Sequence, residues 1–266
     1  MEAMLSDEDI QNHLLKLQKS LKGHDLLKKF EFDERYLLRF LLGANFQIPL
    51  ALKRMQEFHL LLLNHDIWLS LEETADIIRS FNLIHLIGLP IRDRIGRRII
   101  LATLANFDGS ASGQQITINL FRFWCEQLLC DDWALSKGLC ILIDVKEFPW
   151  ALFKWLTPSN IKMGITLLEN YPVKEFMIHF VNKSYLVQAA LKLIWPFLPR
   201  QMQEKMKFHF QNWSSLHEYV DPYYLPKEYA GSGANIDLKS CSEMLLREVD
   251  VVTEILQNNF VPISNT

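Results

Sequence analysis

The fold is decided by residues 171–210, which read YPVKEFMIHFVNKSYLVQAALKLIWPFLPRQMQEKMKFHF. An apolar run follows Tyr171 and Pro172 and predicts a buried strand over about Glu175–Val181. The strand should end at Asn182, and Ser184 is a suitable N-cap for a helix that begins at the next residue. The sequence therefore predicts a strand that runs directly into a helix.

The predicted helix is apolar around most of its circumference. One stripe at three- and four-residue spacing consists of Leu186, Ala190, Leu193 and Phe197, and further apolar groups lie outside it at Tyr185, Val187, Ile194 and Trp195. Pro196 and Pro199 should kink or end the helix. Two interpretations stay open: a core helix packed beside a core strand, or a mobile lid over an apolar cavity with a basic rim.

Motifs in and after this stretch resemble the signature of the CRAL-TRIO lipid-binding domain, the family of cellular retinaldehyde-binding protein and alpha-tocopherol transfer protein. In that family an aromatic-Pro pair precedes a strand that contains His. After the strand come a helix that ends in Pro-Phe-Leu, a Lys-Met-x-x-His helix and a late Leu-Pro-x-Glu-Tyr-Gly-Gly turn. The matching residues are Tyr171, Pro172, Ile178, His179, Asn182, Pro196, Phe197, Leu198, Lys205, Met206, His209, Leu225, Pro226, Glu228, Tyr229 and Gly231. The chain departs at Ser184, where the family usually has Pro, and at Ala230, which would need a backbone conformation that favours Gly.

Composition indicates a soluble, reduced protein. The 266 residues are 49% hydrophobic and 12% aromatic, and the net charge is only −3, which favours no nucleic-acid partner. No apolar run reaches the roughly 18 residues of a membrane span, and the polar, acidic N-terminus is unlike a secretory signal. Four cysteines lack CxxC or metal-ligand spacing, so we expect free thiols, no metal site and a cytoplasmic location.

Residues 1–65 predict an N-terminal helical region. Apolar spacing and cap residues indicate helices over Ser6–Gly23, from Asp33 to Gly43, and over Leu50–Leu63. The region resembles the helices that precede the lipid-binding domain in the same family; the residues that match are Leu37, Leu38, Arg39, Phe40, Leu41 and Phe46. Leu42 and Ala44 replace the family's usual basic residues, which weakens any positive patch here.

The remainder alternates strands and helices, which predicts an α/β fold. A helix over 66–80 precedes a hairpin with its turn at Asp93–Gly96, and a second buried strand begins at Gly138. Helices are expected over Thr117–Leu129, from Pro158, and through the tail to about Leu256. Arg92, Arg94, Arg97 and Arg98 around the turn are expected to form a solvated turn, with a membrane or phosphate role as the minor alternative.

The resemblance implies a helical region over 1–65, a lipid-binding domain over 66–232 with a mixed sheet and flanking helices, and a helical tail over 233–266. One helix, about Tyr185–Leu198, would be a lid over an apolar cavity that binds a small hydrophobic ligand such as a retinoid, tocopherol or other lipid. Candidate cavity residues are Ile118, Phe121, Cys125, Leu139, Ile141, Leu168, Ile178, Phe180, Leu193 and Phe197. Candidate lid and membrane residues are Tyr185, Leu186, Ala189, Ala190, Trp195 and Leu198.

Basic residues near the lid are candidates for anionic lipid. They are Lys174, Lys183, Arg200, Lys205 and Lys207. Relatives of the tocopherol type use basic residues in this region to engage phosphoinositides; Lys174 and Lys205 match, whereas Phe176 and Gln201 stand in place of others. The implied protein is a monomeric intracellular carrier, peripheral and transient at anionic membranes.

No catalytic motif was found, so the sequence predicts a non-enzyme. His179 is expected to be a core histidine, and Asp131 and Asp132 are expected to be solvated at a helix end. Glu175 could anchor a ligand in the cavity or face solvent. Two further alternatives are an interaction module related to GTPase-regulator domains and a scaffold with a collapsed, empty cavity.

Overall fold

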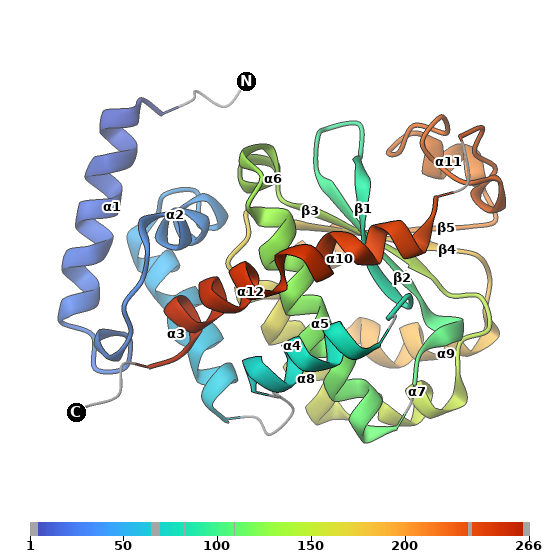
Figure 1. Cartoon of the computed structure of the whole chain (residues 1–266), viewed down its shortest axis with the longest axis horizontal. Helices are drawn as coiled ribbons and strands as arrows, with labels where there is room; N and C mark the ends of the chain where they lie inside the picture. Colours follow the sequence, from blue (N-terminus) through green and yellow to red (C-terminus); the bar gives the residue numbers. More distant parts are fainter. Residues whose placement is uncertain (1–4, 65–69, 82, 109, 234–235, 263–266) are drawn as a thin grey trace.

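A five-stranded mixed sheet forms the centre of the molecule (Figure 1). The computed structural model describes residues 5–64, 70–81, 83–108, 110–233 and 236–262. The strands lie in the order β1-β2-β3-β4-β5; β1 is antiparallel to β2, and β2 to β5 are parallel. Their bounds are β1 Leu86–Arg92, β2 Arg98–Thr103, β3 Leu139–Asp144, β4 Phe176–Val181 and β5 Met206–Phe210.

Helices precede the sheet, connect its strands and follow it. Before the sheet are α1 (Asp7–Lys22), the 3-10 helix η1 (Leu27–Lys29), α2 (Glu34–Gly43), α3 (Ile48–Asn64) and α4 (Leu71–Ser80). Between the strands are η2 (Leu104–Asn106), α5 (Ala111–Leu129), α6 (Asp132–Lys137), α7 (Trp150–Trp155), α8 (Pro158–Asn170), α9 (Tyr185–Ile194), η3 (Trp195–Phe197) and α10 (Arg200–Glu204). After the sheet are α11 (Trp213–His217), η4 (Lys227–Tyr229) and α12 (Leu238–Phe260). The α/β prediction is confirmed.

The N-terminal helices begin where their caps predict. The Ser6 hydroxyl accepts a hydrogen bond from the backbone N–H of Asp9, and the Asp33 carboxylate accepts one from the N–H of Tyr36 at 2.7 Å. Helix α3 begins two residues before the predicted Leu50, at Ile48. Of the helix predicted over 66–80, α4 covers 71–80, and 66–69 lie outside the described residues.

The predicted hairpin and buried strands are present. In the turn between β1 and β2, the Asp93 carboxylate accepts from the backbone N–H of Arg97 at 2.8 Å, and Gly96 has a φ of 98°. Strands β3 and β4 lie within the predicted segments. The first predicted helix after the hairpin is longer than expected, since α5 begins at Ala111 rather than at Thr117.

The segment over Met206–Phe210 differs from its prediction, because the family resemblance implied a helix and the structure has the edge strand β5. Ile178 pairs with Met206 and Phe180 with Phe208, and the rings of Phe180 and Phe208 stack at 4.9 Å. Backbone pairing with β4 satisfies the hydrogen bonds that a helix would have supplied locally. Tertiary pairing therefore overrides the local pattern, and helix α10 ends at Glu204.

The prediction of a solvated arginine-rich turn holds for Arg94, which is exposed, and is wrong for Arg97, which is buried. The Arg97 side chain is 3% exposed and donates hydrogen bonds to Asp93 at 2.6 Å and to Glu175 at 2.8 Å. Glu175 is half-buried by this contact and ties the start of β4 to the hairpin. A buried guanidinium needs such partners, because leaving a charge unpaired in the interior is costly.

The two carboxylates that were expected to be solvated both form ion pairs with arginines. Asp131 accepts from the backbone N–H of Trp133 at 2.8 Å as the N-cap of α6, and it forms an ion pair with Arg92. Asp132 forms an ion pair with Arg35 of α2 at 2.8 Å. The prediction holds for Asp132, whose side chain is 87% exposed, and is wrong for Asp131, because its partner Arg92 lies 39 residues away in sequence.

Helix α12 joins the sheet to the N-terminal helices. It packs against α4, α5 and β1, and in Figure 1 it crosses the molecule as the red helix. At its end the Asn259 amide donates to the Asp33 carboxylate at 2.7 Å, and the Phe260 ring lies 5.4 Å from that of Phe58. The helical prediction for the tail is confirmed, and the helix continues past Leu256 to Phe260.

Candidate functional site

One face of the sheet carries the predicted cavity residues. Partners in register on parallel strands share a face, and Ile100, Ile141, Ile178 and Met206 form one such row. A second row on the same face consists of Ala102, Ile143, Phe180 and Phe208. We call this surface the cavity face. The sequence left the facing of each strand open, and the structure brings the candidates Leu139, Ile141, Ile178 and Phe180 onto it together.

Helix α5 covers the part of the cavity face nearest β1. A Cβ on Gly88 would lie 2.5 Å from the Trp124 ring, so glycine is needed for this close packing. The Phe121 ring lies 5.8 Å from Phe176. Of the predicted cavity residues on α5, Cys125 is fully buried, whereas Ile118 and Phe121 are half-buried.

Helix α9 and η3 form the predicted lid segment, which we call the lid. The Ser184 hydroxyl accepts from the N–H of Val187 as N-cap, and the α-helix gives way to the 3-10 helix that contains Pro196, as predicted. Val187, Ala190 and Leu198 are buried, and the Trp195 ring lies 5.8 Å from Phe208 of the cavity face. The lid therefore lies over the β5 side of the sheet.

The outward side of the lid is also apolar. Tyr185 is 79% exposed, Leu193 52% and Phe197 59%. Leu193 and Phe197 were expected to line the cavity, and the structure instead has both at the protein surface. Of the stripe that contains them, Ala190 is buried, and the buried side of the helix is formed by Val187 and Ala190. Of the other lid candidates, Leu186 is half-buried, and Ala189 and Trp195 are exposed.

The opposite face of the sheet holds a buried histidine pair. His179 Nδ1 lies 2.8 Å from His209 Nε2, and His209 Nδ1 contacts the Ser215 hydroxyl. Burial is the main cause that lowers the pKa of His179 to about 3 and that of His209 to about 4, and the positive charge of Lys207 acts in the same direction on both. Both rings lie within 5.7 Å of the Tyr219 ring. His179 is therefore a core histidine, as predicted, and its partner His209 was not indicated by the sequence.

Residues of the family motif that are far apart in sequence meet at Asp144. The Asn182 amide donates to Asp144 at 2.7 Å, and the Tyr229 hydroxyl donates to its other oxygen at 3.0 Å. Ala230, which follows, has φ 51° and ψ 30°, the left-handed conformation that its place in the motif demands. These contacts fix the carboxyl ends of β3 and β4.

Two of the predicted basic residues share a pocket. Lys174 and Lys205 line a hollow of about 470 Å³, together with Lys53 and Arg54 of α3, which the sequence did not indicate. Its apolar wall includes the predicted cavity residues Leu168 and Ile178. No local pattern could have assigned Lys53 and Arg54, because they lie more than a hundred residues before their neighbours. We call this hollow the basic pocket.

Arg54 is held deep at the edge of the basic pocket. Its Nη2 donates to the carbonyl oxygen of Tyr171 at 2.9 Å, and burial lowers its pKa to about 10. A Cβ on Gly43 would lie 2.0 Å from Arg54 Nη1, so glycine leaves the room that this side chain needs. Glu57, Glu169 and Glu175 also line the pocket, which is therefore not uniformly positive.

The other three basic candidates lie elsewhere. Lys183 Nζ lies 5.2 Å from the centre of the Tyr185 ring at the start of the lid. Arg200 forms an exposed ion pair with Glu204 at 3.2 Å. Lys207 pairs in register with His179 and so lies on the face opposite the cavity face. The five candidates therefore do not form a single patch.

Within the described residues, no helix has the length and apolar character needed to cross a membrane. In the same part of the chain, no group of three or more His, Cys, Asp and Glu residues is arranged to hold a metal ion. The four cysteines are free thiols.

Comparisons with known proteins agree with this geometry. Clavesin-1 of Rattus norvegicus is 29% identical over 217 residues, which span 80% of this chain and 61% of the relative, and Clavesin-2 of Homo sapiens is 28% identical over 217 residues, which span 80% and 66%. The chain thus matches less than two thirds of these relatives. The structure described as "Crystal structure of Sfh5" has the same fold, with a TM-score of 0.52 and 15% identity over 94% of this chain and 98% of that one. The family model for the CRAL/TRIO domain matches residues 85–231, from the start of the hairpin to the turn after η4, and the chain belongs to this family.

Proposed function

We propose that this protein binds one hydrophobic lipid between the cavity face and the lid and carries it between membranes as a peripheral intracellular protein. The observation that carries the proposal is that the lid is apolar on both sides. Val187, Ala190 and Leu198 pack inward, whereas Tyr185 and Phe197 are more than half exposed. An ordinary surface helix has a polar outer face.

The inward side of the lid faces side chains suited to a lipid. Ile143, Phe180 and Phe208 of the cavity face are only half-buried although they lie in the sheet. Apolar surface contributes about 25 cal/mol per Å² when it leaves water, so an enclosed lipid is held without charged contacts. Retinoids, tocopherols and other lipids all offer such surface.

The outward side of the lid supports docking on a bilayer. Helix α7 contacts α9 and adds Trp150, which is 54% exposed and stacks on Phe153 at 5.0 Å. Together with Trp195 and Phe197 they offer aromatic groups to the membrane interface. A membrane that accepts these groups favours an open lid, because it binds the open state better than the closed one.

The basic pocket is suited to an anionic lipid headgroup of moderate charge, because both cations and carboxylates line it. Lys53, Arg54, Lys174 and Lys205 line it, and its wall continues into the cavity face at Ile178. A phosphoinositide headgroup could therefore bind at the rim beside the lipid cavity. The carboxylates of Glu57 and Glu169 in the same wall weaken the pull on highly charged headgroups.

The first test is native mass spectrometry of the purified protein followed by solvent extraction. We expect one lipid per chain, either retained from the host cell or acquired from liposomes that contain retinoid, tocopherol and phosphoinositide. An empty protein whose mass stays unchanged after such incubation would contradict the carrier and favour a non-transporting interaction module.

The second test measures lipid transfer and vesicle binding with the double variant Trp195→Ala/Phe197→Ala. The matched control is Trp133→Ala/Ile95→Ala, which removes exposed apolar side chains from α6 and the hairpin turn. We expect the lid variant to weaken vesicle binding by roughly thirtyfold, from the apolar area withdrawn from the membrane. Equal effects of the two variants would remove the lid from the membrane contact.

A further inference from the structure

A second hollow lies away from the sheet, where the end of α12 meets the N-terminal helices. It has a volume of about 920 Å³, and its walls are the segment before α2, the start of α4 and the last residues of α12. Figure 1 shows the lid helix α9 and the end of α12 on opposite sides of the molecule. The function proposed for the cavity face does not use this hollow, which we call the terminal groove.

The floor of the terminal groove is apolar. Phe32, Leu62 and Phe260 line it, and Val261 at its edge is 49% exposed. Phe32 and Leu62 are half-buried, so each keeps part of its side chain accessible. A groove with such a floor favours a bulky apolar side chain.

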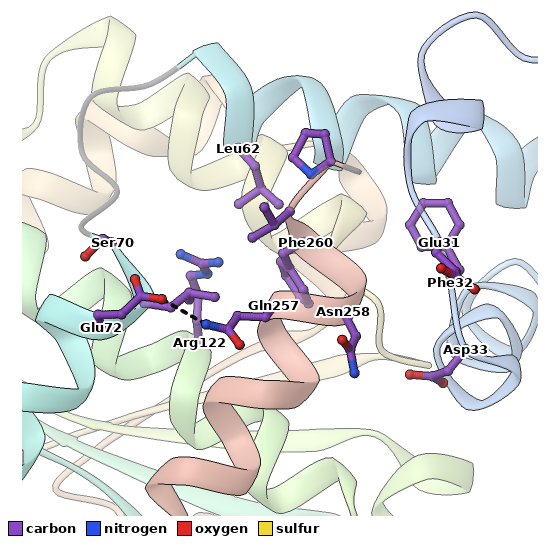
Figure 2. Close-up of a pocket in the computed structure, with 13 residues that line it drawn as sticks. Glu31, Phe32, Asp33, Leu62, Ser70, Glu72, Arg122, Gln257, Asn258 and Phe260 are labelled. Carbon is purple, nitrogen blue, oxygen red and sulfur yellow. Dashed lines mark hydrogen bonds between the residues drawn. The ribbon is translucent and has the colours of Figure 1, made fainter. Parts of the chain in front are cut away.

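Carboxylates lie on both sides of that floor. Figure 2 shows Glu72 on one side of the α12 end and Glu31 and Asp33 on the other. Among the described residues that line the groove, Arg122 is the cation, and it is 5% exposed beneath the floor. Its guanidinium donates to the Asn119 side chain at 3.0 Å and lies 5.2 Å from the centre of the Phe260 ring. The accessible charge of the groove is therefore negative.

Some acidic side chains in this region have a structural role as helix caps, and others do not. Asp33 caps α2, and Glu73 completes the capping box of α4 with Ser70. Glu31 and Glu72 have neither role. Glu72 accepts a hydrogen bond from the Gln257 amide at 2.8 Å, which a neutral amide oxygen could also accept. Glu31 is exposed beside the groove. Neither carboxylate is needed as a helix cap, so both can serve recognition.

We propose that the terminal groove docks an extended basic segment of a partner protein. One bulky apolar side chain of that segment would occupy the floor at Leu62 and Phe260, and Lys or Arg side chains on either side of it would meet Glu72 and Glu31. The order basic, apolar, basic follows from the carboxylates that flank the floor. Charge complementarity of this kind sets orientation and partner choice. An anionic membrane is disfavoured at this surface for the same reason.

The test uses fluorescence anisotropy with a labelled peptide of sequence Ac-Lys-Lys-Gly-Leu-Trp-Gly-Lys-Lys-NH2. We expect saturable binding with a dissociation constant of about 100 µM or tighter, as is usual for a short peptide in a groove. Two control peptides, one with Glu for every Lys and one with Ala for Leu and Trp, should bind at least about tenfold more weakly. No saturable binding of the first peptide up to about 1 mM would overturn the proposal.

The protein variants locate the binding. Glu31→Gln/Glu72→Gln should weaken the peptide about fivefold at low salt, because exposed charge pairs are individually weak. The matched control is Glu218→Gln/Glu228→Gln, which changes the same net charge at exposed positions at the end of α11 and in η4. The variant Leu62→Ala tests whether the peptide contacts the apolar floor of the groove. The amide spectrum of this variant checks that its fold is intact. Equal weakening by the rim and control variants would show attraction to overall charge and would overturn the groove as the site.

Discussion

At the scale of single residues, the pair of His179 and His209, on the sheet face opposite the cavity face, makes the stability of the protein depend on pH. The pKa of His179 falls from 6.5 to about 3 and that of His209 to about 4 in the folded protein. Well above pH 6.5 the two histidines are neutral in both the folded and the unfolded chain, so they give stability no pH dependence there. Between pH 6.5 and about 4 the unfolded chain binds protons that the folded chain excludes, so stability falls as pH falls.

We expect urea unfolding to give a free energy that decreases by about 1.4 kcal/mol per pH unit for each such histidine within that window. The variant His209→Gln should reduce the slope between pH 6 and 5 by about this amount. Arg97, Lys207 and Tyr219 face the pair. A slope that is unchanged in the variant would mean that His209 is not held neutral.

Ala230 gives a second prediction at this scale. Its left-handed conformation, with φ of 51°, costs an alanine roughly 1 kcal/mol that glycine does not pay. We expect Ala230→Gly to raise the free energy of unfolding by about 0.5–1 kcal/mol. The control Ala189→Gly, at an exposed position within α9, should lower it by about 1 kcal/mol. Thermal unfolding of the two variants should therefore shift in opposite directions.

Residues with local partners could be predicted from the sequence, and residues with distant partners could not. The caps Ser6 and Asp33 and the strain at Ala230 depend on neighbours within a few positions. The burial of Arg97 depends on Glu175, 78 residues away. A charged side chain in a turn is usually solvated, so nothing near Arg97 in sequence indicates its buried pair.

At the scale of elements, a buried ion pair connects α2, α5 and the chain before β4. Arg39 donates to both carboxylate oxygens of Glu126, and Arg39 Nε donates to the carbonyl of Pro172. The Tyr171 hydroxyl donates to the same carboxylate at 2.9 Å. Side-chain exposure is 5% for Arg39 and 1% for Glu126, so solvent cannot replace either partner.

We expect Glu126→Gln to lower the free energy of unfolding by about 3–5 kcal/mol, because it leaves the Arg39 charge buried and unbalanced. The matched control is Asp132→Asn, which removes the carboxylate that pairs with Arg35 on the same helix α2 at the surface. That change should cost less than about 1 kcal/mol. Chemical denaturation measures both, and similar losses would mean that the buried pair contributes no more than a surface one.

The pattern of apolar residues along the sequence predicted most helices and strands. It failed where a strand forms by pairing with a segment that is distant in sequence. Strands β3 and β4 are continuous apolar runs, and the lid begins at its cap Ser184. The segment over Met206–Phe210 was expected to be helical and is β5, because its pairing with β4 supplies the hydrogen bonds. The helix α9 was predicted, but Leu193 and Phe197 face outward, since helical periodicity cannot tell which of two apolar sides is buried.

At the scale of the whole molecule, the two hollows differ in charge and lie apart. The basic pocket adjoins the cavity face, whereas carboxylates flank the terminal groove at the end of α12. With the lid against a bilayer, the terminal groove would remain accessible to a protein partner, because Figure 1 has α9 and the end of α12 on opposite sides. The net charge of −3 conceals this separation, and no count of residues along the sequence could reveal it.

This separation predicts that membrane binding depends on where positive charge lies and not on its total. We expect Lys174→Ala/Lys205→Ala to weaken binding to anionic vesicles by about thirtyfold, since a basic residue near such a surface contributes about 1 kcal/mol. The control Lys16→Ala/Lys19→Ala removes the same charge from exposed positions on α1. Vesicle co-sedimentation at 0.1 M salt should separate the two variants, and the difference should shrink at 0.5 M as screening shortens the reach of the charges. If both variants bound equally weakly, total charge would govern docking and the basic pocket would have no special part in it.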